Sequence, residues 1–274
     1  MILLLSFINN THELVGFHFL KVPADARTCA LAGIVWPSEG YGIFSNPVML
    51  QGEGREVFFS GRYHLAGSIE EIGWKGGFGR FSLGAGLRVF YVPGIELRGD
   101  IPGELYGTYP SLEGDMVFSV AGRLTKDLLG GVSIHRLFQQ IFDKTEGLWA
   151  WGLSLMHYPA KWMWVYLGAD YISSSYGDGY HLPTTVKLGA GVRVGNLLFG
   201  IEGVKPYDTK YTINAGVEIR HEMLRVRGGL RAGHDTELGS LGIGVEWKRF
   251  SIDYAGVVYR YLGVNHTGSV KVRL

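Results

Sequence analysis

Between residues 211 and 220 the chain reads Tyr-Thr-Ile-Asn-Ala-Gly-Val-Glu-Ile-Arg, so apolar side chains alternate with polar or small ones. Successive side chains of a β-strand point to opposite faces of a sheet, which makes a period of two the mark of a half-buried strand. The same alternation recurs at 185–194, 223–232 and 238–247. These stretches predict strands with one apolar face and one polar or glycine-rich face.

Extending this pattern from Arg55 to the C-terminus predicts fourteen strands. Their expected bounds are 55–65, 68–75, 80–91, 114–124, 129–138, 147–157, 162–171, 185–194, 196–204, 210–220, 223–232, 238–247, 249–258 and 265–274. Short turns alternate with longer loops, for example at 92–113 and 139–146. An even number of antiparallel strands connected in this way is typical of an outer-membrane β-barrel. A soluble β-sandwich is the main alternative, although it usually has fewer strands.

The composition agrees with a membrane barrel. Among 274 residues there are 42 glycines and 9 prolines, with 13% aromatic and 19% charged residues. This aromatic content argues against a disordered chain, and a net charge of +1 argues against a nucleic-acid-binding module. One cysteine excludes an intrachain disulfide, and no apolar run reaches the length of a membrane-spanning helix. On the predicted strands many glycines face the lumen, where we expect them to permit curvature and leave space.

If the apolar face of each strand contacts lipid, the charged residues of the other face line the lumen. The predicted lumen-lining set is Arg88, Arg123, Lys187, Arg193, Glu218, Arg220, Arg225, Arg227, Arg231 and Glu246. Two interpretations are open, because buried charges must be paired or hydrated. The set either forms ion pairs that brace the barrel or makes a basic lumen that attracts an anionic head group. The pairs Trp149/Trp151 and Trp162/Trp164 indicate an interfacial aromatic girdle.

The first 54 residues lack the strand pattern. Residues 1–12 resemble a truncated signal peptide, because the apolar run at 2–8 has no preceding basic region; a buried strand is the alternative. Residues 13–54 are too few for a core of their own, so we expect them to pack against the barrel (55–274) as a hatch. A short helix is predicted near 24–33, and Pro47 should hold Asn46 outside the helical region.

The order Phe19-Leu20-Lys21-Val22-Pro23, then Ala26-Arg27, then Phe44-Ser45-Asn46-Pro47-Val48 resembles the N-terminal signature of the PorV/PorQ-type outer-membrane protein family. That family is distantly similar to FadL-type channels for hydrophobic compounds. The C-terminal stretches 230–233, 242–248 and 250–255 fit the same pattern. The resemblance implies a fourteen-stranded barrel with an N-terminal hatch that carries Asn46 and Pro47. Val48 stands where the motif usually has alanine, and the short chain implies trimmed external loops.

Sequence motifs of enzymes and metal sites are absent. The chain has no GxSxG, P-loop or HExxH motif, and its nine histidines form no metal-binding pair, so no catalytic residue, metal or cofactor is expected. The nearest approach to a lumenal hydrolase is Ser133 beside His135 on one strand face. Asp170 with the loop at 173–179 has the composition of a Ca²⁺ site, but a solvated turn is the simpler interpretation.

The expected function follows from the barrel and the resemblance. We expect a non-enzymatic protein in the outer membrane of a diderm bacterium that binds or passes hydrophobic or amphipathic small molecules. The alternative is a non-transporting scaffold or shuttle in protein secretion, as the PorV/PorQ resemblance implies. Expected partners are outer-membrane lipid, such a small molecule or secretion-system proteins, but not nucleic acid.

Overall fold

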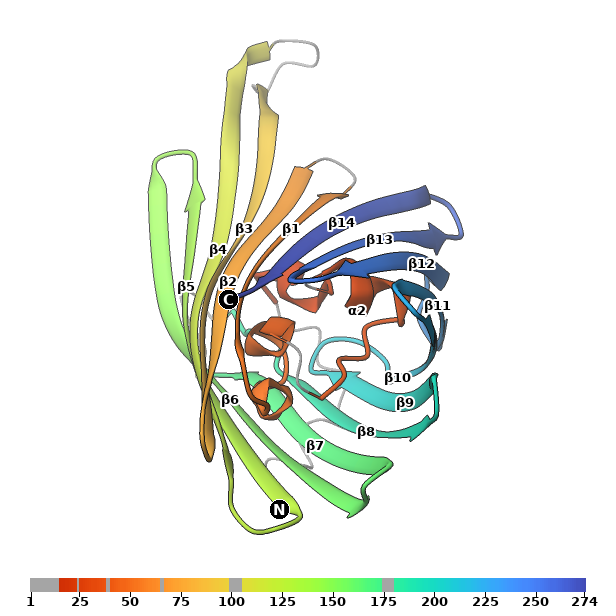
Figure 1. Ribbon diagram of the computed structural model, residues 1–274. Helices are drawn as coiled ribbons and strands as arrows, with labels where there is room; N and C mark the ends of the chain where they lie inside the picture. Colours follow the sequence, from red (N-terminus) through yellow and green to blue (C-terminus); the bar gives the residue numbers. More distant parts are fainter. Residues whose placement is uncertain (1–14, 24, 38–39, 65–66, 99–104, 174–179) are drawn as a thin grey trace.

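A computed structural model describes residues 15–23, 25–37, 40–64, 67–98, 105–173 and 180–274 of the chain. It confirms the predicted fold, a closed barrel of fourteen antiparallel strands in which β14 pairs with β1 (Figure 1). The strands are β1 (Arg55–His64), β2 (Gly67–Phe78), β3 (Phe81–Arg98), β4 (Leu105–Arg123), β5 (Leu128–Ile141), β6 (Lys144–Ala160), β7 (Met163–Ile172), β8 (Thr185–Val194), β9 (Leu197–Pro206), β10 (Thr212–His221), β11 (Leu224–Ala232), β12 (Glu237–Trp247), β13 (Phe250–Tyr259) and β14 (Gly263–Arg273).

The alternation along each strand separates a lipid-type surface from the lumen. On the outside, Ile213 is 44% exposed and Leu241 is 70% exposed, and large apolar side chains of the other strands project in the same way. On the inside of β10, Thr212, Asn214 and Glu218 are buried. An apolar outer band with a polar interior is the arrangement that a bilayer-spanning barrel requires. No helix in the described ranges is long and apolar enough to cross a membrane.

The long loops expected at 92–113 and 139–146 are wrong. β3 continues to Arg98 and β4 already begins at Leu105, so the hairpin that they form projects beyond the rest of the barrel (Figure 1). A register shift between Val92 and Ile95 accommodates Pro93 and Gly94, after which the ladder resumes. β5 and β6 are likewise joined by only two residues. Proline and glycine therefore mark a bulge here rather than the end of pairing.

The N-terminal segment (residues 15–54) lies inside the barrel (Figure 1). It contains η1 (His18–Lys21), α2 (Ala26–Ala30), η2 (Gly40–Phe44) and η3 (Pro47–Leu50). α2 is the helix predicted near 24–33, and Asp25 caps it by accepting a 3.0 Å hydrogen bond from the Thr28 amide. α2 packs against β11–β14, η2 against β1–β4 and η3 against β3–β6. The predicted signal peptide at 1–12 lies outside the described residues.

Apolar contacts hold the N-terminal segment against the wall. Trp36 meets Trp164 of β7 edge to face, with ring centroids 5.4 Å apart, inside a buried cluster that includes Leu31 and Met49. Each large side chain buried in this way contributes about 1.5–3 kcal/mol. Trp164 is therefore a correction to the predicted girdle, because it points into the lumen, whereas Trp149, Trp151 and Trp162 are exposed on the outside.

The lumenal glycines act differently from the prediction. A Cβ at Gly229 would lie 2.5 Å from the Ala32 nitrogen and 2.8 Å from the Leu31 carbonyl carbon, so the N-terminal segment fills that place. A Cβ added at Gly84 or Gly86 would likewise clash with the Ile43 side chain. Gly84, Gly86 and Gly229 thus provide a seat for the N-terminal segment rather than empty space.

Candidate functional site

The lumen is braced by ion pairs centred on Glu218 of β10. Its carboxylate lies 2.8 Å from Nε of Arg27, 2.6 Å from Nε of Arg220 and 2.6 Å from Nε of Arg227. Arg227 also contacts Asp253, at 2.5 Å. Arg27 comes from α2 and the other residues from the barrel, so the cluster joins the N-terminal segment to the wall.

Further ion pairs engage most of the other predicted lumenal charges. Their nitrogen–oxygen distances are 2.8 Å for Arg88–Glu71, 2.8 Å for Lys187–Asp170, 2.7 Å for Arg231–Glu237 and 2.8 Å for Arg225–Glu246. The guanidinium of Arg88 also lies over the Phe44 ring, 4.6 Å from its centroid. These contacts match the bracing interpretation, since each of these lumenal cations contacts a carboxylate.

Two predicted lumen residues lie at the rim of the lumenal face, where Arg123 pairs with Leu129 and Arg193 pairs with Leu198 in their ladders. Arg123 and Arg193 are exposed near the end of the barrel that carries the short turns. For Asp170 both the calcium and the solvated-turn interpretations are wrong, because its carboxylate is buried and paired with Lys187. The stretch 174–179 of that loop lies outside the described residues, and among the described residues no group of three or more His, Cys, Asp or Glu side chains is placed to hold a metal.

Asn46 and Pro47 lie deep in the lumen. Pro47 is the first residue of η3, and Asn46 before it has φ −165° and ψ 88°, outside the helical region as predicted. The Asn46 side chain does not cap η3, and its buried Oδ1 has no hydrogen-bond partner. The role of this pair in a hatch stays a prediction.

A lumenal cavity of about 380 Å³ opens toward the end of the barrel with the longer connections. Leu20, Val22 and Pro23 of the N-terminal segment form one side of it. The barrel contributes apolar side chains such as Val204 together with paired charges. The further lining residues include Arg88, Asp170, Tyr171, Lys187, Glu202, Asn214, Lys210, Arg231 and 233–236. The cavity is thus a charged vestibule with an apolar side.

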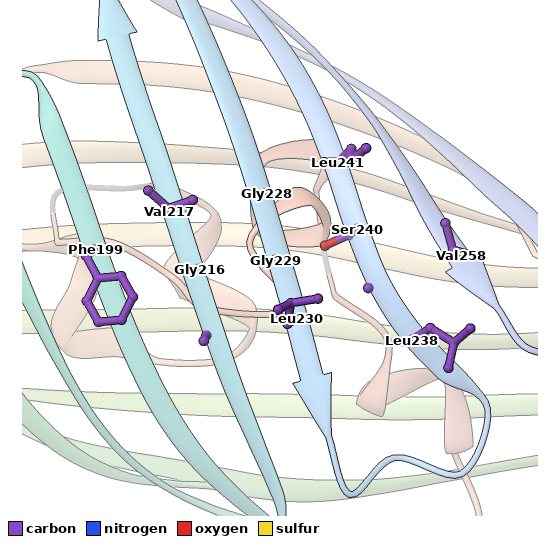
Figure 2. A pocket seen from close by; sticks show the side chains of 12 residues that line it. Phe199, Gly216, Val217, Gly228, Gly229, Leu230, Leu238, Ser240, Leu241 and Val258 are labelled. Carbon is purple, nitrogen blue, oxygen red and sulfur yellow. The ribbon is translucent and has the colours of Figure 1, made fainter.

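A second cavity, of about 560 Å³, is an apolar hollow on the outside of β9–β13 (Figure 2). Phe199, Val217, Leu230, Leu238, Leu241 and Val258 surround it. The small residues Ala215 and Gly228 leave the space, and a register shift between Glu237 and Gly239 interrupts the neighbouring ladder. The alternation of β10 and β11 showed two faces, but not that small residues on adjacent strands come together.

The two cavities lie on opposite faces of the same strand pair. On the inside, Asn214 of β10 and Arg231 of β11 line the lumenal cavity. On the outside, the hollow begins at the adjacent pair of the ladder, Ala215 of β10 and Leu230 of β11. The next pair of the ladder, Gly216 and Gly229, faces inward onto Leu31 and Ala32 of the N-terminal segment.

No protein-family model matches the chain, and no curated protein is similar to it in sequence. Solved structures share its fold. The monoaromatic hydrocarbon channel CymD aligns with a TM-score of 0.65 at 11% identity, over 92% of this chain and 98% of that one. The toluene transporter TodX of Pseudomonas putida gives 0.63 at 9% identity, over 92% and 96%. A FadL homologue of Pseudomonas aeruginosa gives 0.61 at 9% identity, over 91% and 98%. The chain is a fourteen-stranded barrel that resembles outer-membrane channels.

Proposed function

We propose that this protein is a channel in the outer membrane of a diderm bacterium that binds and passes hydrophobic small molecules. The observation that carries the proposal is the pair of cavities on opposite faces of β10 and β11. Solved structures with the same fold include channels described for toluene and monoaromatic hydrocarbons, which supports this function over an enzymatic one.

The lumenal charges favour a neutral ligand over an anionic one. Lys187 is held by Asp170, and Arg231 by Glu237, so a carboxylate entering the cavity would have to compete with an existing partner. Breaking a buried ion pair costs about 3–5 kcal/mol. A single new contact between the ligand carboxylate and the freed cation would not offset that cost. The proposed ligand is therefore an uncharged hydrophobic or weakly amphipathic molecule, and the predicted lumenal set acts as a brace.

In this proposal the N-terminal segment is the hatch of the channel. It fills the lumen through clusters that include Trp36, Ile43 and Phe44, and Arg27 ties it to Glu218. Asn46 lies where the segment turns into η3; its buried Oδ1 has no hydrogen-bond partner, and the amide of Val48 in the same turn donates a 2.9 Å hydrogen bond to the Ser154 hydroxyl of β6. Passage requires this segment to shift, which moves no strand of the barrel.

Deleting residues 24–50 tests the hatch. The barrel strands keep their ladder, so the variant should fold and raise the permeability of liposomes to small solutes. Unchanged permeability, with β-structure retained by circular dichroism, would contradict the hatch. A second measurement compares uptake of toluene with uptake of benzoate by cells that carry the full chain; equal stimulation of both would contradict the preference for neutral ligands.

The alternative function, a non-transporting secretion scaffold of PorV/PorQ type, has no support from the comparisons, which relate the fold to hydrocarbon channels. The motif at Asn46 and Pro47 remains compatible with a distant relation between the two groups. No observation on the described residues favours a docking role.

A further inference from the structure

A serine, a histidine and an aspartate form a hydrogen-bonded chain in the wall of the barrel. Ser133 and His135 lie on the lumenal face of β5, and Asp115 lies on neighbouring β4. The Ser133 Oγ is 2.9 Å from Nε2 of His135, and Nδ1 of the same ring is 2.9 Å and 3.1 Å from the two carboxylate oxygens of Asp115. The three residues are 1%, 1% and 0% exposed.

Because Asp115 contacts Nδ1 of His135 and Ser133 contacts Nε2, the contacts determine which ring nitrogen can accept a proton. A carboxylate at Nδ1 favours the tautomer that carries its proton there, which leaves Nε2 free to accept the serine proton. A nucleophile bonded to a base, which a third group orients, is the arrangement that activates serine for acyl transfer. We propose that Ser133 is the nucleophile of an acyl-transfer site that hydrolyses apolar carboxylic esters, with His135 as general base and Asp115 as the positioning residue.

The proposed reaction has two steps. The Ser133 Oγ bonds to the ester carbonyl carbon and its proton passes to Nε2 of His135. The carbon–oxygen bond to the alcohol then breaks, and the departing alcohol takes that proton, which leaves an acyl-serine. A water molecule, deprotonated by Nε2, attacks the acyl-serine; the carboxylic acid leaves and Ser133 recovers its proton. No oxidant, reductant or metal is needed.

The surroundings of the site point to an apolar acyl chain. The His135 ring lies 4.9 Å from the Tyr171 ring, centroid to centroid. Tyr171 belongs to a buried apolar cluster with Phe17, Leu137 and Ala150, and it also lines the lumenal cavity. An ester that enters this cavity therefore meets an apolar surface next to the histidine.

The N-terminal segment covers the serine. Ser119, directly opposite Ser133 in the β4–β5 ladder, donates a 3.2 Å hydrogen bond to the Ile43 carbonyl oxygen. Gly131, two residues before Ser133 on the same face, is packed so closely under η3 that an added Cβ would lie 2.7 Å from the carbonyl carbon of Pro47 and 2.8 Å from Cα of Val48. Displacing η3 should therefore expose Ser133.

The test uses the purified full-length protein in detergent and a fluorophosphonate, which phosphonylates an activated serine and releases fluoride. We expect labelling of Ser133, identified by mass spectrometry of the digested protein. It should be faster in Gly131→Ala and absent in Ser133→Ala and in Gly131→Ala/Ser133→Ala. Ser119→Ala is the matched control, because it removes a buried serine that contacts no histidine, and it should keep the label.

Asp115→Asn tests the positioning role, because the amide no longer favours the required tautomer. Labelling should slow by about 10²-fold or more without loss of the barrel in circular dichroism, and Asp115→Glu, which keeps the carboxylate, should recover part of that rate. A structural Ser–His–Asp contact would instead give no label in any variant. If Val48→Cys in a Cys29→Ala/Gly131→Ala background reacts with a maleimide, showing that η3 has lifted, and Ser133 still stays unlabelled, the proposal is overturned. Solute permeability enters none of these readouts, so they stand apart from the channel proposal.

Discussion

Arg27 of the N-terminal segment holds both carboxylate oxygens of Glu218 on β10, through Nε at 2.8 Å and Nη2 at 3.0 Å. This is the two-pronged geometry in which a guanidinium binds a carboxylate most firmly. Arg220 and Arg227 share the same carboxylate from the barrel side. Glu218 therefore stabilises the barrel wall and also attaches the N-terminal segment to it.

Substitutions of Arg27 and of Glu218 should affect different parts of the protein. Arg27→Met leaves Glu218 with two arginines and should weaken only the attachment of the N-terminal segment, by about 1.5–3 kcal/mol. Glu218→Gln leaves three guanidinium groups without their shared carboxylate and should cost the whole barrel about 3–5 kcal/mol. Urea unfolding in lipid vesicles measures the second effect. The rate of maleimide labelling at Cys29, two residues from Arg27, measures the first.

Equal loss of barrel stability in both variants would contradict this division. Arg225→Met is a suitable control, because Arg225 pairs with Glu246 rather than Glu218. It should leave Cys29 labelling unchanged.

Cys29 predicts a pH dependence of this attachment. The thiol is buried on α2, and burial raises its pKa from 9.0 to about 11. Because the docked state favours the neutral thiol, its contribution is complete below the pKa of the exposed thiol and is lost as the pH rises toward about 11. We expect the segment to loosen over this range, with faster proteolysis within residues 15–54. Cys29→Ala should remove this component, and an identical pH profile in that variant would contradict the assignment.

The strands could be predicted because their signal is local. The alternation at 211–220 depends only on neighbouring residues and the pleat, and β10 follows it closely. The β3–β4 hairpin was missed because Pro93 and Gly94 usually interrupt pairing, and only the partner strand shows that they form a bulge. Likewise, Trp164 reads as a girdle residue until Trp36 is found beside it in the lumen.

The candidate sites depend on strand register, which one sequence does not give. Ser133 and His135 share a face by parity alone, but Asp115 joins them only because β4 lies beside β5 in one particular register. The outer hollow likewise requires Gly228 to lie between Val217 and Leu241, which come from different strands. Ion pairing of the lumenal charges was predictable as a class, since buried charges need partners, whereas the individual partners were not.

The Lys187–Asp170 pair tests whether lumenal charges brace the barrel or bind a ligand. Lys187→Met leaves a buried carboxylate without its cation and should reduce the free energy of unfolding by about 3–5 kcal/mol. Lys187→Met/Asp170→Leu removes both charges and should recover most of that loss. Toluene uptake should persist in the double variant. Uptake abolished in a folded double variant would show that the charges serve the ligand rather than the fold.

Two neighbouring glycines of β11 separate the roles of the outer hollow and the N-terminal segment. A Cβ at Gly228 points outward and meets only Leu241 at 3.6 Å and Val217 at 4.0 Å, which are ordinary contacts. A Cβ at Gly229 points inward onto the backbone of Leu31 and Ala32, at 2.8 Å and 2.5 Å. Gly228→Ala should therefore fold normally, and Gly228→Leu should fill the hollow and reduce toluene uptake several-fold without changing Cys29 labelling. Gly229→Ala should do the reverse, since it displaces the N-terminal segment: Cys29 labelling and solute permeability should both rise. If Gly228→Leu left uptake at the wild-type level, the outer hollow would not lie on the path of the hydrophobic molecule.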